Sequence, residues 1–113
     1  MKRLILLVSA LLLTLQFPVY AASGSRVVTV SKIHPIAAVR PAGGSNLIRV
    51  YVDAAPWGQT ACRTDAADLQ KDDKHLLASL FWAMSMNKQI TIEVDDTLTP
   101  MDAVCQITAM FVE

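Results

Sequence analysis

Residues 72–94, DDKHLLASLFWAMSMNKQITIEV, contain the change of hydrophobic period that decides the fold class. In residues 72–86 the apolar side chains recur at steps of three and four, at Leu76, Leu77, Leu80, Phe81 and Met84. This spacing predicts an amphipathic helix, with Asn87 in the left-handed position that ends it. Residues 88–94 then alternate strictly between apolar and polar side chains, which predicts a half-buried strand. We therefore expect a helix that lies against a sheet.

The segments on both sides of this unit are rich in β-branched residues and turn residues. The strands that this pattern predicts are residues 26–33, 47–52, 59–63, 88–94 and 103–112. Residues 23–25 are expected to be a polar leader, and residues 34–46, with two prolines and a Gly-Gly-Ser-Asn cluster, to be a loop. The order β-β-β-α-β-β with one helix indicates a β-rich α+β domain, specifically a small oligonucleotide/oligosaccharide-binding (OB) barrel. An open antiparallel sheet carrying one helix is the alternative.

Residues 1–21 have the three parts of a secretory signal peptide. A basic pair opens the segment, residues 4–17 are almost all apolar, and Pro18 precedes a cleavage position after Ala21. We predict that residues 22–113 form a single exported bacterial domain, periplasmic or secreted, with no membrane span after cleavage. The alternative is an uncleaved membrane anchor. It is disfavoured because this apolar run is shorter than the roughly 18 residues that a span needs.

The charge of the exported part excludes one class of partner. Two of the ten basic residues lie in the signal segment, which leaves eight against ten acidic side chains, a net charge of −2. A nucleic-acid-binding domain needs a concentrated basic surface. Nucleic-acid binding is therefore not expected.

Cys62 and Cys105 are the two cysteines of the chain, and both lie in the exported part. In an oxidising compartment an even pair predicts a disulfide. A catalytic thiol is the alternative, but neither cysteine has a histidine in a recognisable local motif. We expect Cys105 to face inward on the last strand, on the same side as Ile107, Ala109 and Phe111, with Cys62 on the third strand.

Residues 59–94 carry three features that together match one known family: a short segment ending in a cysteine, a helix with a characteristic apolar core, and a polar turn that leads into an alternating strand. The residues concerned are Cys62, Leu76, Leu77, Ala83 and residues 88–94. In these features the chain resembles the B-subunit family of subtilase-type bacterial AB5 toxins. The resemblance implies an OB-type barrel that forms a ring, most often a pentamer, binds sialylated or related glycans, and accompanies a catalytic toxin chain. The family's sugar-contacting serine has no counterpart here, so no glycan-binding residue is transferred.

Four side chains are candidates for ligand binding. Trp57 lies in a Pro-Trp-Gly turn beside Tyr51 and Asp53, and an exposed indole there would stack on a sugar ring. Trp57 as a cap on one end of the barrel is the favoured interpretation. Arg63 has a planar guanidinium that suits the carboxylate of an anionic sugar, although a solvated arginine is the more common outcome.

The helix also presents candidates for a subunit interface. Trp82, Met84 and Met86 are large apolar residues near its end, and methionine is common at contact surfaces. Trp82 in the core, or stacked on a ligand, is the alternative.

The remaining polar residues do not form a recognisable catalytic or metal-binding motif. Asp65, Asp68, Asp72 and Asp73 lack the glycine and terminal glutamate of a calcium loop, and a solvated helix entrance is the simpler interpretation. Asp95 and Asp96 fit a turn after a strand, and His34 and His75 have no evident partner. We expect no cofactor, no metal and no enzymatic activity. Two hypotheses lead: a carbohydrate-binding subunit, and a periplasmic structural or interaction protein such as an inhibitor or envelope accessory. A hydrolytic enzyme is a third, less favoured alternative, because a fold does not determine a function.

Overall fold

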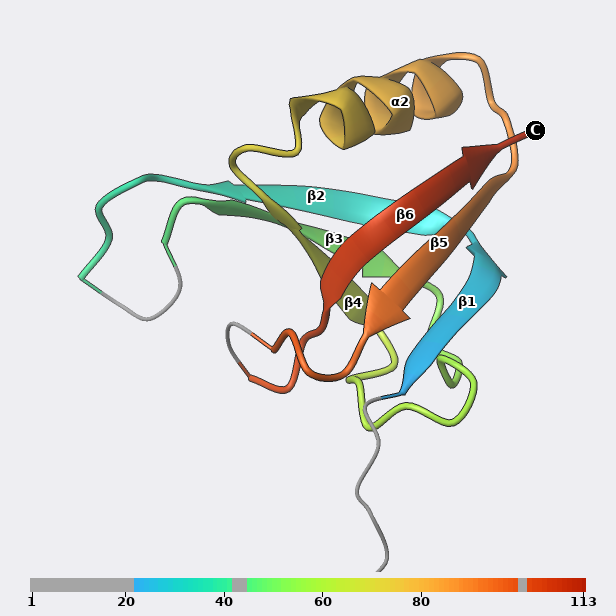
Figure 1. Ribbon diagram of the computed structural model, residues 1–113. Helices are drawn as coiled ribbons and strands as arrows, with labels where there is room; N and C mark the ends of the chain where they lie inside the picture. Colours follow the sequence, from blue (N-terminus) through green and yellow to red (C-terminus); the bar gives the residue numbers. More distant parts are fainter. Residues whose placement is uncertain (1–21, 42–44, 100–101) are drawn as a thin grey trace, which may run out of the picture.

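The computed structural model describes residues 22–41, 45–99 and 102–113 (Figure 1). The elements in this part of the chain are six strands and one helix: β1 (Ser23–Val28), β2 (Val30–Ile36), β3 (Leu47–Val52), β4 (Ala66–Gln70), α2 (Lys74–Ser85), β5 (Ile90–Asp95) and β6 (Gln106–Val112). The predicted signal peptide, residues 1–21, lies outside the described residues. Within the described ranges no helix has the length and apolar character needed to cross a bilayer.

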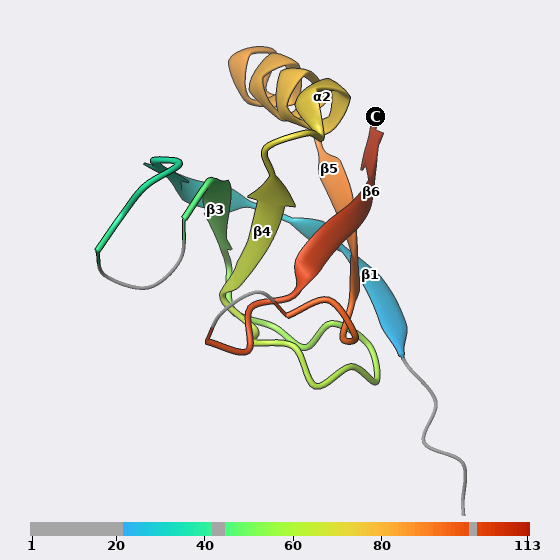
Figure 2. The ribbon, with the colours of Figure 1, turned by 60° about the vertical axis from the view of Figure 1, so that its left-hand side comes forward.

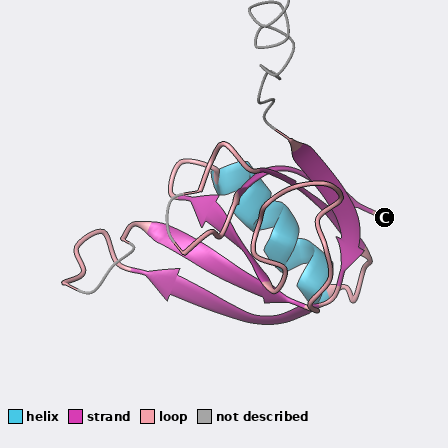
Figure 3. Cartoon of the chain, turned by 90° about the horizontal axis from the view of Figure 1, so that it is seen from below, coloured by secondary structure: helices cyan, strands magenta, loops and turns pink. Residues whose placement is uncertain are grey.

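The six strands form one curled sheet with the order β1-β5-β6-β4-β3-β2. Its two edge strands, β1 and β2, are separated only by Thr29, so they are two halves of one bent strand that pairs with β5 at one end and β3 at the other. The sheet therefore curls back on itself. Seen from the end opposite α2, the strands surround the interior and the helix lies across the far opening (Figure 3). The predicted strand-rich fold with one helix is confirmed, and its six-stranded sheet is curled into a half-barrel.

The third strand is not where the sequence pattern placed it. Residues 59–63 form a loop, and the strand is β4, which pairs antiparallel with β3 and touches β6 in parallel through Asp68 and Gln106. In β4 only Ala67 and Leu69 face the core, so its apolar signal is weak. Cys62 accordingly lies in the loop before the strand.

The first strand is longer than expected at both ends. Residues 23–25 are not a free leader, because they pair with β5 from Ser23, opposite Asp95. At the other end β2 continues to Ile36 and includes Pro35. A proline is tolerated there because β2 lies at the sheet edge, where one row of backbone groups has no strand to bond.

The last strand begins at Gln106 rather than at residue 103, and it contains a bulge. The pairing with β5 shifts between Glu93 and Val94, which leaves Thr108 as an extra residue in β6. The bulge reverses the alternation. Ile107 faces the core, but beyond Thr108 Met110 and Val112 pack inward while Phe111 is exposed. The expectation that Phe111 shares the inner face with Ile107 is wrong for this reason.

The helix α2 begins and ends within two residues of the predicted range and packs over one end of the barrel (Figure 2). Leu80 and Ala83 are fully buried, and Leu76 and Leu77 pack against the core beside them. Asn87 has a φ of 53°, the left-handed conformation expected of it, and the Lys88 amide donates to the Ala83 carbonyl at 2.8 Å. The predicted helix and its stop signal are confirmed.

Candidate functional site

Trp57 closes the end of the barrel opposite α2. Its side chain is only 1% exposed, and its indole Nε1 donates a hydrogen bond to the Arg63 carbonyl at 2.9 Å. The Arg26 guanidinium lies over the ring, 4.3 Å from its centroid. Both the edge and a face of the indole are therefore occupied by protein groups. The exposed stacking platform considered for Trp57 is wrong, and the favoured interpretation, a cap on the barrel, describes the structure.

Asp53 holds the bend of the first strand. Its Oδ1 accepts from the Thr29 amide at 2.8 Å and lies 3.4 Å from Arg26 Nη1, while Arg26 Nη2 donates to the Asp53 carbonyl at 2.6 Å. The hydrogen bond from the Thr29 amide, with help from Arg26, lowers the pKa of Asp53. These bonds join β1 and the bend at Thr29 to the end of β3, so Asp53 has a structural role.

The disulfide between Cys62 and Cys105 is present, with the two Cα atoms 5.4 Å apart. It ties the loop before β4 to the residue before β6. Arg63, next to it, is paired through Nη2 with Asp65 Oδ2 at 3.0 Å, and this pairing raises the pKa of Arg63. Both side chains are more than a third exposed, so the pair is accessible to solvent.

Tyr51 belongs to a polar outer face that the sequence did not reveal as a unit. In β3 and β4 residues that face the core alternate with residues that face outward. The strand register places the outward residues of neighbouring strands side by side. His34 is opposite Arg49, Arg49 opposite Asp68, and Asp68 opposite Gln106. Tyr51 lies one row away, with the Lys32 ammonium 4.4 Å from its ring centroid. We call this surface the polar face; its members are Lys32, His34, Arg49, Tyr51, Asp68 and Gln70.

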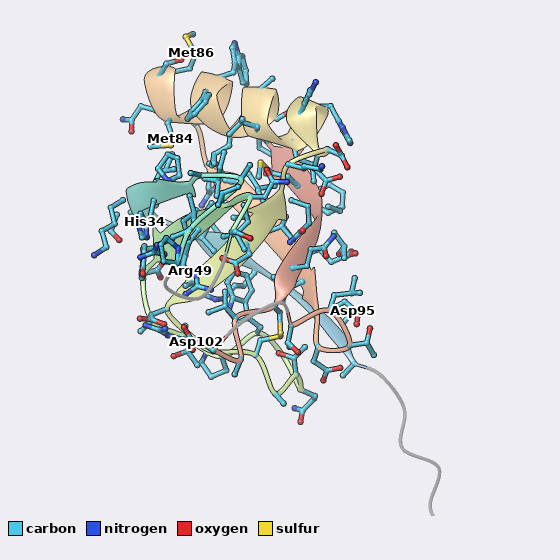
Figure 4. The ribbon with its side chains drawn as sticks, turned by 90° about the vertical axis from the view of Figure 1, so that its left-hand side faces the viewer. His34, Arg49, Met84, Met86, Asp95 and Asp102 are labelled. Carbon is cyan, nitrogen blue, oxygen red and sulfur yellow. A yellow bond between two sulfur atoms is a disulfide. The ribbon has the colours of Figure 1, made fainter. Side chains whose placement is uncertain are left out.

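A buried ion pair lies at the centre of the polar face. Arg49 binds Asp68 through two parallel hydrogen bonds, Nε to Oδ1 at 2.9 Å and Nη2 to Oδ2 at 3.0 Å. Arg49 is 6% exposed and Asp68 is fully buried. Asp102, on the connection between β5 and β6, lies 3.5 Å from Arg49 Nη1. His34, Arg49 and Asp102 lie on one side of the molecule (Figure 4).

The electrostatics of this pair follow from its burial. Removal from water raises the pKa of Asp68, while the guanidinium of Arg49 opposes that rise. The same contact raises the pKa of Arg49 above its usual range. Each charge is stable in the interior only because the other is present. The pair thus fixes the side chains around it.

The acidic residues considered for calcium do not converge. Asp65 and Asp68 are each bound to an arginine, and Asp72 and Asp73 precede the helix. In the described ranges no group of three or more histidine, cysteine or carboxylate side chains could hold a metal ion. His75 is exposed on α2.

Asp95 and Asp96 serve the connection after β5, as the turn interpretation predicts. Asp95 ends the strand, and the Thr97 hydroxyl and amide both donate to its Oδ1, which lowers the pKa of Asp95. Asp96 Oδ1 accepts from the Ala22 amide at 2.9 Å. Asp95 therefore stabilises its own turn, whereas Asp96 ties this connection to the residue before β1.

The end of α2 exposes large apolar side chains. Trp82 is 51% exposed, and Phe81, Met84 and Met86 are similarly open; these four form the helix-end patch. A groove of about 420 Å³ lies between this end of the helix and the bend of the first strand, with Val27, Val30 and Met84 among its lining residues. The predicted interface residues are thus accessible, which core packing of Trp82 would not allow.

Comparison with models of known protein families, with curated proteins and with solved structures finds no match to this chain. The likeness to toxin B subunits therefore has no support beyond the sequence features that suggested it. The polar face and the helix-end patch are the two surfaces on which a function can be proposed.

Proposed function

We propose that the protein is an exported, non-enzymatic binding module that recognises a carbohydrate with its polar face. The observation that carries the proposal is the array of hydrogen-bonding side chains on adjacent strands β2, β3 and β4, fixed around the Arg49–Asp68 pair. OB barrels in general bind ligands on the face of their second and third strands and on the two adjoining loops. Here these strands are β3 and β4.

The chemistry of the face supports a sugar over a nucleic acid. Arg49 and Arg63 are both paired with carboxylates, so their charges are already compensated within the protein. Tyr51 and His34 supply ring surfaces, and Lys32 and Gln70 supply polar groups, while the buried Arg49–Asp68 pair fixes the strands that carry them. Sugars combine hydroxyl groups with an apolar C–H face, which suits this mixture.

The disulfide supports export, because such bonds persist in oxidising compartments. Assembly as a ring is a further part of the proposal, taken from the resemblance to toxin B subunits. The helix-end patch supports it, because an exposed apolar surface of this kind favours contact with another chain. A catalytic toxin chain would be a partner of that ring.

A glycan array tests the proposal directly. We expect the wild-type protein to bind a defined set of glycans, and Tyr51→Ala to lower that binding by about tenfold, as expected for loss of a central aromatic contact. Phe111→Ala is the matched control, since Phe111 is an exposed aromatic on β6, away from the polar face. Absence of any glycan bound by wild type contradicts the proposal, as does equal loss in both variants.

A second candidate is a structural or interaction protein of the envelope, and the helix-end patch favours it. In that case Trp82→Ser would abolish recovery of a specific protein partner from purified periplasm, while the glycan array would be blank. Binding to glycans by wild type, unchanged in Trp82→Ser, would contradict this candidate.

A further inference from the structure

A groove lies where the first strand leaves β5, between the bend at Thr29 and the end of α2. Its volume of about 420 Å³ falls within the range of small-molecule sites. The groove is open to solvent, since Val27 is 50% exposed and Met84 is 42% exposed. We call it the Lys88 groove; its lining includes Val27, Val30, Met84, Asn87, Lys88 and Gln89.

Two walls of the Lys88 groove are apolar. Val27 and Val30, one on each side of the bend, form the strand wall, and Met84 comes from α2. Figure 4 shows Met84 on the side of the helix that faces the strands, whereas Met86 points away from them. An apolar group that enters between these walls is removed from water, which favours its binding.

The rim of the groove is polar and carries one positive charge. Residues 87–89, Asn-Lys-Gln, connect α2 to β5, and all three are exposed. Among the described residues Lys88 is the only charged side chain of the lining, and within that part of the chain its ammonium has no ion pair or hydrogen bond. The backbone carbonyls of residues 82–84, at the end of the helix, already accept from the amides of residues 86–88. The ammonium can therefore pair with an anion in the groove.

Both sides of the groove are held in place by hydrogen bonds to the backbone. On the strand side, the Thr29 amide donates to Asp53 Oδ1 at 2.8 Å, and the Thr29 carbonyl accepts from the Asp53 amide at 3.1 Å. On the rim, the Lys88 amide donates to the Ala83 carbonyl at 2.8 Å. A site that is formed in advance binds a ligand at a smaller entropic cost.

We propose that the Lys88 groove binds a medium-chain fatty acid. The carboxylate pairs with the Lys88 ammonium, and the hydrocarbon chain lies between the strand wall and Met84. One ammonium matches the single negative charge of a carboxylate, and the apolar walls match a chain without polar groups. The inference is independent of carbohydrate binding, because the groove shares no lining residue with the polar face.

The test is a calorimetric titration of the exported protein with octanoate. We expect octanoate to bind, and hexanoate to bind more weakly by about fourfold for each methylene removed, because each methylene would be buried in the groove. Octanol has the same chain without the charge. It should bind at least about tenfold more weakly than octanoate, since it cannot form a charge-assisted hydrogen bond with both partners ionised.

Two variants separate the charge from the walls. Lys88→Gln should lower the affinity for octanoate by about tenfold and leave that for octanol unchanged. Met84→Gln should weaken both ligands, because it makes one wall polar. Both residues are exposed, so the thermal midpoints of these variants should stay close to that of wild type. Lys71→Gln is the matched control, since Lys71 is an exposed lysine after β4 that does not line the groove.

Nuclear magnetic resonance of the methyl groups locates the ligand. Octanoate should shift the signals of Val27, Val30 and Met84. Shifts confined to Met86, equal binding of octanol and octanoate, or an unchanged octanoate affinity in Lys88→Gln would each overturn the proposal. No binding of octanoate at millimolar concentration would also overturn it, even if the protein sediments with vesicles of anionic phospholipid. A blank glycan array would refute the proposed function and leave this inference in place.

Discussion

Removal of one partner from the buried Arg49–Asp68 pair should destabilise the protein far more than removal of both. Asp68 is fully buried, and the two hydrogen bonds from Arg49 at 2.9 and 3.0 Å satisfy its carboxylate. Replacing Arg49 with methionine leaves a buried negative charge, which costs about 3–5 kcal/mol. In a domain of this size each 1 kcal/mol of stability shifts the thermal midpoint by about 4–8 °C, so the midpoint of Arg49→Met should fall by more than about 12 °C.

The assay is a double-mutant cycle by urea denaturation with the disulfide intact. Arg49→Met and Asp68→Leu should each be strongly destabilised, whereas the double variant should lie within about 1–2 kcal/mol of wild type because no charge is left without a partner. Asp102→Ala is the control: Asp102 is 54% exposed and its removal should cost less than about 1 kcal/mol. A coupling energy below about 1 kcal/mol for the buried pair would refute the argument, because that is the behaviour of an exposed pair.

Three further changes have defined outcomes. A Cβ at position 24 would overlap the carbonyl oxygen of Trp57. Gly24→Ala should therefore lower the free energy of unfolding, measured by urea denaturation, by about 1–3 kcal/mol or more. A variant as stable as wild type would contradict the close packing. The double variant Cys62→Ala/Cys105→Ala removes a disulfide between residues 43 positions apart, and its free energy of unfolding should be lower than that of wild type by about 4 kcal/mol. A decrease below about 1 kcal/mol would argue that the disulfide does not stabilise the fold. The pKa of Asp53 is lowered in the folded protein, so its contribution is present above the unfolded pKa of about 3.9 and lost on acidification. The stability difference between wild type and Asp53→Asn should therefore be largest at neutral pH and shrink as the pH falls below the unfolded pKa, and a difference that does not change with pH would refute this.

The sequence predicted those elements whose signal is local. The spacing of Leu76, Leu80 and Ala83 reports one helix face, and the alternation of residues 88–94 reports one strand face, so both were found correctly. The strand β4 was missed because only two of its residues, Ala67 and Leu69, face the core and because its outward Asp68 resembles a solvated acid. The bulge at Thr108 has no local signature, since it arises from the register with β5.

The candidate site depended on contacts between distant residues. Trp57 was considered as an exposed stacking platform because it lies in a turn, but Gly24 packs against its backbone and Arg26 covers its ring, both more than thirty positions earlier in the chain. Arg49 and Asp68 are 19 positions apart and become partners only through strand register. One signal was present in the sequence. Arg49 occupies an outward position in an otherwise apolar strand, and such a charge is stabilised by an acidic side chain on the neighbouring strand.

The claim that the polar face is the ligand-binding surface is tested most directly by a map of backbone amide shifts. The labelled, exported protein would be titrated with a pool of sialylated and N-acetylated oligosaccharides. We predict that the largest shifts fall on β3, β4 and the start of β6, around Tyr51, Asp68, Gln70 and Gln106. Shifts confined to β1 and the helix-end patch, or no shifts at all, would contradict it.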